Sequence, residues 1–195
     1  MKFRQITPED LPKAMLYQFW RVWFEADPWG ERYRCPVHNR FDDFSSKGRF
    51  RDPGVCHVCG TELVPYWTDE RITEYLHQVF SKPGLVVLGG FSDDDKIVAW
   101  SWGYLADEIS AFDGLPRGGL YVDHIGFDPD HSAQDVDGFL EAGEQLARRL
   151  GYRYLATRTH READYVKAAI APHRYAFYAM CPDETDREYW AVPPW

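Results

Sequence analysis

The sequence predicts an α+β domain (a mixed α/β sheet, mostly antiparallel, with flanking helices) that carries a small metal-binding insert. Three observations lead to this prediction. Helical and strand-like hydrophobic patterns alternate along the 195 residues. Two strand-like segments, Leu85 to Phe91 and Lys96 to Leu105, flank a short polar turn that is typical of a hairpin. Two close pairs of metal-ligand residues lie in a segment that is poor in aliphatic side chains.

The N-terminal part is expected to form one strand and two helices around this insert. Phe3 to Ile6 has the pattern of a short strand. Thr7 to Phe24 begins with an N-cap residue and a proline at the first helical position, and continues with apolar residues at helical spacing. Thr68 to Phe80 has the same features of a helix, with Thr68 as the cap and two acidic residues in the first turn.

The C-terminal part continues the alternation after the hairpin. A proline between two aspartates ends the next strand, and Gly151 is the expected C-cap of a long amphipathic helix. The expected elements in order are a strand at Leu120 to Phe127, a helix at Ser132 to Leu150, a strand at Tyr152 to Thr157, a helix at Glu162 to Ile170, and strands at Arg174 to Met180 and Arg187 to Val192.

Composition excludes several classes of protein. The net charge is −9, which argues against broad binding to nucleic acid or to anionic membranes. No apolar run approaches the roughly 20 residues that cross a bilayer, and the start lacks the apolar core of a signal peptide. We therefore expect a cytoplasmic protein. Cys181 is the only cysteine outside the two ligand pairs, so the sequence implies no disulfide framework.

The two ligand pairs predict a zinc site. Cys35 and His38 form the first pair, Cys56 and Cys59 form the second, and Gly60 follows directly. Each spacing of two residues lets a tight turn aim two side chains at one ion. Exchanging His38 for His57 gives an alternative ligand set, and cysteines that are merely buried are the alternative to any metal. Because four protein ligands leave no open position, the zinc is expected to be structural, within a zinc-ribbon-like insertion (31–65) of one domain (1–195).

The order of the elements resembles that of the GNAT superfamily of N-acetyltransferases. The likeness is closest where Leu120 to Asp130 (LYVDHIGFDPD) resembles the fourth strand of the family and the turn after it, and where Leu140 to Leu155 resembles the following helix and fifth strand. The resemblance implies that these two strands splay apart and hold the pantetheine arm of acetyl-CoA or another acyl-CoA. It also implies that Ile125 and Phe127 supply backbone groups for this arm, and that the acyl group passes to an amine of a small molecule or peptide.

The resemblance also implies catalytic residues. Family members often carry on the fourth strand a carboxylate that takes a proton from the amine, and Asp123 and His124 occupy this stretch. Their side chains are expected to point to opposite faces of the strand, and a purely structural Asp–His contact is the alternative. A tyrosine on the last short helix often protonates the departing thiolate, and Tyr165 is the candidate here. The acceptor is expected near the insert, with Trp20, Trp23, Trp29 and Trp67.

One departure from the family pattern affects the function. The stretch that aligns with the pyrophosphate loop, Ser132 to Asp137, lacks the arginine and both glycines and places Asp135 and Asp137 near the phosphates. Two carboxylates there repel a pyrophosphate, unless they only satisfy the helix N-terminus or point to solvent. Three functions therefore remain: an acyl-CoA-dependent acyltransferase, a non-catalytic binding module with a degenerate CoA site, and a transferase with another donor such as a charged tRNA or a modified nucleotide.

Overall fold

The computed structural model describes residues 1–7, 33–38, 40–41, 54–56, 58–66, 68–127, 133–161, 164–181 and 187–195. The predicted helix after Thr7, residues 42–53 of the insert and the four tryptophans expected near the acceptor lie outside the described residues, as does His57.

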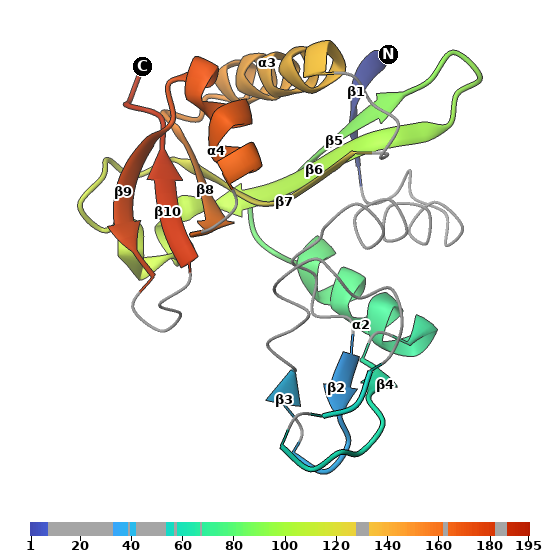
Figure 1. Ribbon diagram of the computed structural model, residues 1–195. Coiled ribbons are helices and arrows are strands. Elements are labelled where there is room, and N and C mark those ends of the chain that lie inside the picture. The colour runs from blue at the N-terminus through green and yellow to red at the C-terminus, as the bar shows by residue number, and fades with distance from the viewer. Residues whose placement is uncertain are drawn as a thin grey trace.

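A seven-stranded sheet forms the body of the molecule (Figure 1). Its strand order is β1-β5-β6-β7-β8-β10-β9, and every neighbouring pair is antiparallel except β7 and β8, which are parallel. The strands are β1 (Lys2–Ile6), β5 (Val86–Phe91), β6 (Ile97–Leu105), β7 (Leu120–Phe127), β8 (Leu155–His160), β9 (Ala176–Met180) and β10 (Arg187–Ala191). The predicted fold class is thus confirmed.

Helices cover both faces of this sheet (Figure 1). On one face, α2 (Asp69–Phe80) packs Leu76 and its neighbours against Trp100 and Trp102 of β6. On the other face, α3 (Ala133–Arg149) packs Phe139 against Ala99 of β6, and α4 (Asp164–Ile170) lies against α3. Short 3₁₀ turns occupy Ala106–Glu108, Ser110–Phe112 and Ala171–His173. Among the described residues, no helix has the length and apolar character needed to span a bilayer.

The predicted boundaries lie within two residues of the observed ones for most described elements and are wrong for one strand. Thr68 caps α2 as expected, since its hydroxyl accepts a hydrogen bond from the Arg71 N–H at 3.4 Å. The strand expected at Tyr152 to Thr157 begins and ends three residues later, at Leu155–His160. Residues 158–160 are polar and lack the alternating apolar pattern of a strand, but β10 pairs with β8 as far as His160.

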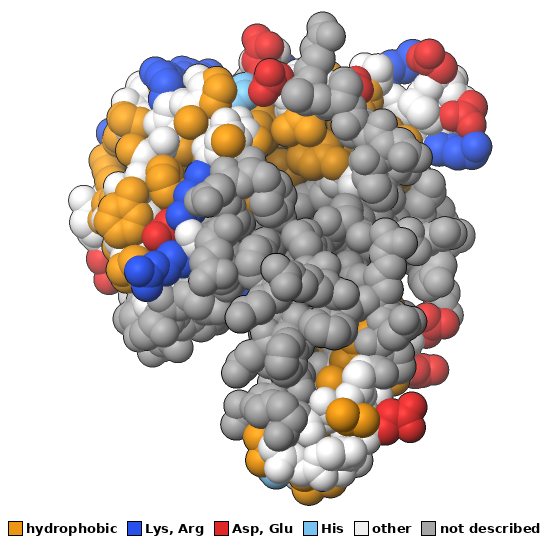
Figure 2. Space-filling model, viewed as in Figure 1, with side chains coloured by type: hydrophobic (Ala, Val, Ile, Leu, Met, Phe, Trp, Pro, Cys, Tyr) orange, Lys and Arg blue, Asp and Glu red, His pale blue; other side chains and the backbone are white. Residues whose placement is uncertain are grey.

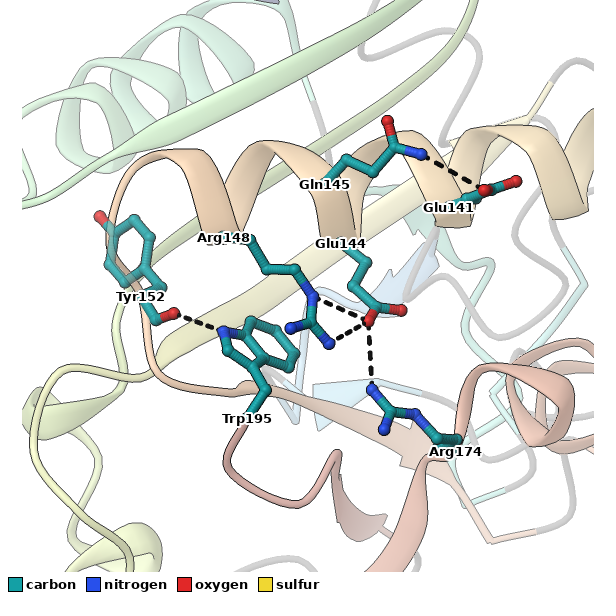
Figure 3. A network of polar contacts seen from close by, with 7 residues as sticks. All are labelled: Glu141, Glu144, Gln145, Arg148, Tyr152, Arg174 and Trp195. Carbon is teal, nitrogen blue, oxygen red and sulfur yellow. Dashed lines mark hydrogen bonds and ion pairs between the residues drawn. The ribbon is translucent and has the colours of Figure 1, made fainter.

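The C-terminal residue and the segment after α4 are fastened to α3 (Figure 3). Trp195 donates its indole N–H to the carbonyl oxygen of Tyr152 at 2.9 Å, and the Arg148 guanidinium stacks 3.9 Å from the centre of the Trp195 ring. Glu144 accepts hydrogen bonds from Arg148 at 2.7 Å and from Arg174 at 3.2 Å. These contacts fix α3, the connection between β7 and β8, against the end of the chain.

Candidate active site and metal centre

The four predicted metal ligands converge at one point. The ligand atoms of Cys35, His38, Cys56 and Cys59 all lie within 4.8 Å of one another. Cys35 Sγ is 3.6 Å from Cys59 Sγ and 3.4 Å from His38 Nδ1, and Cys56 Sγ is 3.7 Å from the same nitrogen. A tetrahedral zinc ion would place its ligand atoms about 3.8 Å apart for two sulfurs and about 3.6 Å apart for sulfur and nitrogen. The donor set and its spacing therefore fit a metal ion.

Local backbone structure builds this cluster from two turns. His38 donates its backbone N–H toward Cys35 Sγ at 3.5 Å, which closes the first turn. In the second turn Gly60 has a φ of 70°, a left-handed conformation that favours glycine, and its N–H bonds the Cys56 carbonyl oxygen at 2.7 Å. Thr61, whose hydroxyl lies 3.2 Å from Cys59 Sγ, lowers the pKa of that thiol to about 7, toward the thiolate form that binds metal.

A small sheet carries the cluster. It has the order β3-β2-β4 and consists of β2 (Tyr33–Cys35), β3 (Arg40–Phe41) and β4 (Val64–Pro65). We call the described residues 33–66 the metal module. In Figure 1 it lies beyond α2, on the side away from the large sheet. Its outer end presents apolar side chains (Figure 2). Val37 and Val58, each directly before the second ligand of a pair, are exposed.

An aromatic ring joins the metal module to α2. The guanidinium groups of Arg34 in β2 and Arg71 in the first turn of α2 lie 5.0 and 4.7 Å from the centre of the Tyr66 ring. Such cation–π contacts contribute about 0.5–1 kcal/mol each at exposed sites. These two contacts connect α2 to the metal module.

The parallel strands β7 and β8 separate after three residue pairs. They pair at Leu120, Tyr121 and Val122, opposite Leu155, Ala156 and Thr157. At the last pair the Thr157 hydroxyl donates to the Val122 carbonyl oxygen at 2.9 Å. Beyond this point β7 stays paired with β6 and β8 stays paired with β10. Within the described residues, no strand pairs with the β8 side of β7 over residues 125–127, which we call the unpaired edge of β7.

A β-bulge lies where the strands separate. Trp102 and Gly103 are consecutive in β6, but their partners in β7 are His124 and Val122. Asp123 lies between these two partners and is therefore the extra residue of the bulge. The side-chain alternation therefore shifts by one residue at Asp123. The prediction that Asp123 and His124 point to opposite faces is wrong for this reason: Asp123 Oδ2 lies 3.8 Å from His124 Nε2.

Both polar side chains lie on the face of the sheet that α2 covers. The side chains are 12% exposed for Asp123 and 17% exposed for His124. Tyr75 of α2 reaches His124, with its Oη 2.8 Å from Nε2. The His124 ring also stands edge-on to Trp102, with the ring centres 5.1 Å apart. Gly126, two residues further, leaves room for Trp100, because a Cβ there would lie 3.0 Å from that indole.

The charge of Asp123 acts on the tyrosines around it. Burial and then the negative charge of Asp123 raise the pKa of Tyr75, Tyr104 and Tyr121, and the Tyr104 hydroxyl also hydrogen-bonds Asp123. The positive charge of Arg158, the first residue of β8 after the last pair, lowers the pKa of the same three phenols. A carboxylate, a guanidinium and protonated phenols therefore share one partly buried environment.

The other predicted site residues lie on β7, α4 and α3. Ile125 and Phe127 belong to the unpaired edge of β7, and their side chains pack into the core beneath α3. Tyr165 belongs to the first turn of α4, and its side chain is outside the described part. Asp137 points to solvent, with its side chain 60% exposed and its Oδ1 3.7 Å from His173 Nε2. The Asp135 side chain is partly buried.

Sequence reasoning missed Tyr75, Tyr104, Tyr121 and Arg158. Tyr75 reads as one of the apolar residues at helical spacing, and its contact with His124 joins residues 49 positions apart. No local pattern signals such a contact. For Arg158, the only available signal was that a polar residue directly follows a strand-like run.

The sheet order, the single parallel pair that separates after three residues, and the helices on both faces define the GNAT acyltransferase fold. No protein-family model and no curated protein matches the sequence. Solved structures do match in fold. One is the PaiA N-acetyltransferase of Thermoplasma acidophilum in complex with coenzyme A, with a TM-score of 0.56 and 10% identity over 98% of this chain and 99% of that one.

Two further structures match over nearly their whole length. The ribosomal-protein-S18-alanine N-acetyltransferase of Escherichia coli has a TM-score of 0.53 and 11% identity, over 99% of this chain and 94% of that chain. A GNAT-family acetyltransferase of Streptococcus pneumoniae has a TM-score of 0.55 and 14% identity, over 97% of this chain and 96% of that chain. At these identities the likeness establishes the shared fold.

Proposed function

We propose that this chain is an N-acyltransferase that moves an acyl group from an acyl-CoA to an amine of a small molecule or peptide. The observation that carries the proposal is the separation of β7 from β8 beyond Val122 and Thr157. The unpaired edge of β7 offers backbone N–H and C=O groups to an extended ligand, which can add to the edge as a strand does. A similar fold in complex with coenzyme A supports this choice of donor.

Each residue then has a role in the proposed reaction. Backbone groups of Ile125 and Phe127 hold the pantetheine arm along the unpaired edge of β7. Asp123 takes a proton from the acceptor ammonium through a water molecule, and the amine nitrogen attacks the thioester carbonyl carbon. The carbon–sulfur bond breaks and Tyr165 gives its proton to the departing thiolate. The second proton of the attacking nitrogen then passes to the tyrosinate, which restores Tyr165 and leaves the neutral amide. His124, whose Nε2 lies 3.8 Å from Asp123 Oδ2, takes part in the same proton transfer.

The residues at the start of α3 favour a second candidate, a binding module of the same fold without CoA affinity. Two like charges about 5 Å apart repel by about 3 kcal/mol at an effective dielectric constant of about 20. The exposure of Asp137 to solvent supports the enzyme, because water and salt screen its charge. Asp135, which is partly buried, is the residue that favours the binding module.

In the proposed enzyme, the metal module helps to shape the part of the site that binds the acceptor. We propose that Cys35, His38, Cys56 and Cys59 hold a structural zinc ion within an insertion at residues 31–65 of a single domain, 1–195. The ion would supply folding energy, since the four protein ligands leave no open position for chemistry. Through Tyr66 and Arg71 the metal module orients α2, which carries Tyr75 to the site.

Calorimetric titration with acetyl-CoA tests the proposed donor. We expect a dissociation constant in the micromolar range, and absence of binding at millimolar acetyl-CoA would remove the acyl-CoA enzyme from consideration. The double variant Asp135→Asn, Asp137→Asn identifies the obstacle in that case. Asparagine removes both charges and destabilises the helix less than glycine does. A gain in affinity for acetyl-CoA would therefore show that repulsion between these carboxylates and the pyrophosphate weakens the site.

A further inference from the structure

Asp123 and Arg158 lie at matching positions where β7 and β8 separate. Val122 and Thr157 form the last pair between these parallel strands, and Asp123 and Arg158 are the next residue of each strand. Neighbouring strands of a sheet are about 5 Å apart, so the two backbones begin to diverge from about this distance. A carboxylate and a guanidinium are therefore carried on the two sides of the point where the strands separate.

The two side chains also share one face of the sheet. Arg158 is the cross-strand partner of Tyr189, and such partners in antiparallel strands lie on the same face. The ring of Tyr189 packs 6.4 Å from that of Tyr121, which in turn packs 5.5 Å from that of Tyr104. The Tyr104 hydroxyl hydrogen-bonds Asp123. These contacts place Arg158 on the face of Asp123, which is the face that α2 covers.

Partial burial strengthens the electrostatic effect of both groups. The Asp123 side chain is 12% exposed, and Arg158 is partly buried. Burial and the carboxylate raise the pKa of three nearby phenols and the guanidinium lowers it, the three being those of Tyr75, Tyr104 and Tyr121. Both charges therefore act within one small region, where water screens them less than at the surface.

We propose that Arg158 binds a carboxylate of the acceptor, and that the acceptor is a free amino acid with its amine and carboxylate on the same carbon or on adjacent carbons. This inference rests on the proposed function, in which Asp123 takes a proton from that amine. A plain amine would add a positive charge to a partly buried site whose own two charges cancel, whereas a zwitterion offers a partner to each group. A guanidinium has five N–H donors and uses two for a carboxylate, so Arg158 can bind the ligand and keep contacts within the protein.

The spacing of the two groups selects the class of acceptor. Because Asp123 and Arg158 start from neighbouring strands, the ammonium and the carboxylate that they bind must be close together in the ligand. Free amino acids meet this requirement. Diamines lack the carboxylate, and the N-terminus of a peptide has an uncharged carbonyl group in its place. Loss of one member of a buried charge pair weakens binding by about 30-fold or more, so the preference for the free acid should be large.

Saturation-transfer NMR of the full-length, zinc-loaded protein tests the inference without catalysis. Equimolar pools of free α- and β-amino acids and of the corresponding amino acid amides are compared, each with and without coenzyme A. An amide keeps the ammonium and the side chain of its amino acid but lacks the negative charge. We expect at least one free amino acid to bind, and titration should show that its amide binds at least about 30-fold more weakly.

Variants of Arg158 assign this preference to one side chain. Arg158→Gln should weaken binding of the free amino acid at least about 30-fold and binding of its amide less than about threefold, whereas a damaged fold would weaken both alike. Arg158→Lys keeps the charge without the two parallel hydrogen bonds, and should keep part of the preference. Arg153→Gln is the matched control, because Arg153 is exposed in the segment before β8, and it should bind both ligands as the wild type does.

Two results would overturn the inference. One is a wild-type protein that binds no free amino acid, or binds the amides as tightly as the acids, and this result requires no variant to fold. The other is an Arg158→Gln protein that keeps the wild-type preference. The measurement does not depend on acyl transfer, so a protein that binds amino acids through Arg158 but fails to bind acetyl-CoA would refute the proposed function alone.

Discussion

Asp123→Asn should lower kcat/KM for acyl transfer by about 10²–10⁴-fold, because a positioned general base contributes about that much to a rate. Asparagine has the size of aspartate and can still accept the Tyr104 hydrogen bond, so the fold and the affinity for acetyl-CoA should change little. The variant removes only the group that takes the proton. Release of the CoA thiol, followed with a thiol-reactive chromogen, measures the rate against a panel of a diamine, an amino acid amide and a short peptide with a free N-terminus.

Asp93→Asn is the matched control for this substitution. Asp93 lies in the exposed turn between β5 and β6, far along the sheet from the bulge, and its replacement should leave the rate unchanged. Activity of Asp123→Asn within threefold of wild type would mean that the carboxylate is not the base. Partial recovery in Asp123→Glu would support a direct role for the negative charge.

Cys56→Ser should abolish stoichiometric zinc binding and unfold the metal module. Cys56 is buried, and its Sγ lies 3.7 Å from His38 Nδ1, so the loss of its thiolate leaves three ligands in a cluster with few apolar residues. Metal binding supplies about 10–16 kcal/mol in small sites of this type. Since even outer partners of metal ligands are worth 10–100-fold in affinity, loss of a direct ligand should cost more than about 100-fold.

Elemental analysis and limited proteolysis measure the two parts of this prediction. The wild-type protein should contain one zinc ion per chain and resist cleavage at residues 33–38 and 58–66, whereas Cys56→Ser should be metal-free and cleaved there. Cys181→Ser is the control, because Cys181 is buried beside Tyr189 in a different core and should keep its zinc. A metal-free wild-type protein, or a Cys56→Ser protein with a full zinc content, would contradict the assignment.

The metal centre and the strand that carries the site could be predicted from local sequence. Cysteine and histidine at two-residue spacing followed by Gly60 predict two turns and a shared ion, and the four ligand atoms do converge. The strand expected at Leu120 to Phe127 is observed with those bounds, because this stretch is rich in aromatic and β-branched residues and a proline between two aspartates follows it. In both cases the residues that determine the structure are close together in the chain.

The geometry of the candidate active site could not be predicted, because it depends on contacts between distant segments. The bulge at Asp123 arises from the pairing of β7 with β6, and it reverses the expected direction of one side chain. Residues 158–160 extend β8 only because β10 pairs with them. Tyr75 reaches His124 because α2 packs across the tryptophans of β6, which no pattern within the helix reveals.

Hydrogen–deuterium exchange along β7, with and without saturating acetyl-CoA, tests most directly whether the unpaired edge of this strand holds the thioester arm. The account predicts that the amides of residues 125–127 that face away from β6 exchange readily in the free protein and become protected when acetyl-CoA binds. Protection of the distant strand β1 should not change. Calorimetric binding of acetyl-CoA without protection of residues 125–127 would contradict the account.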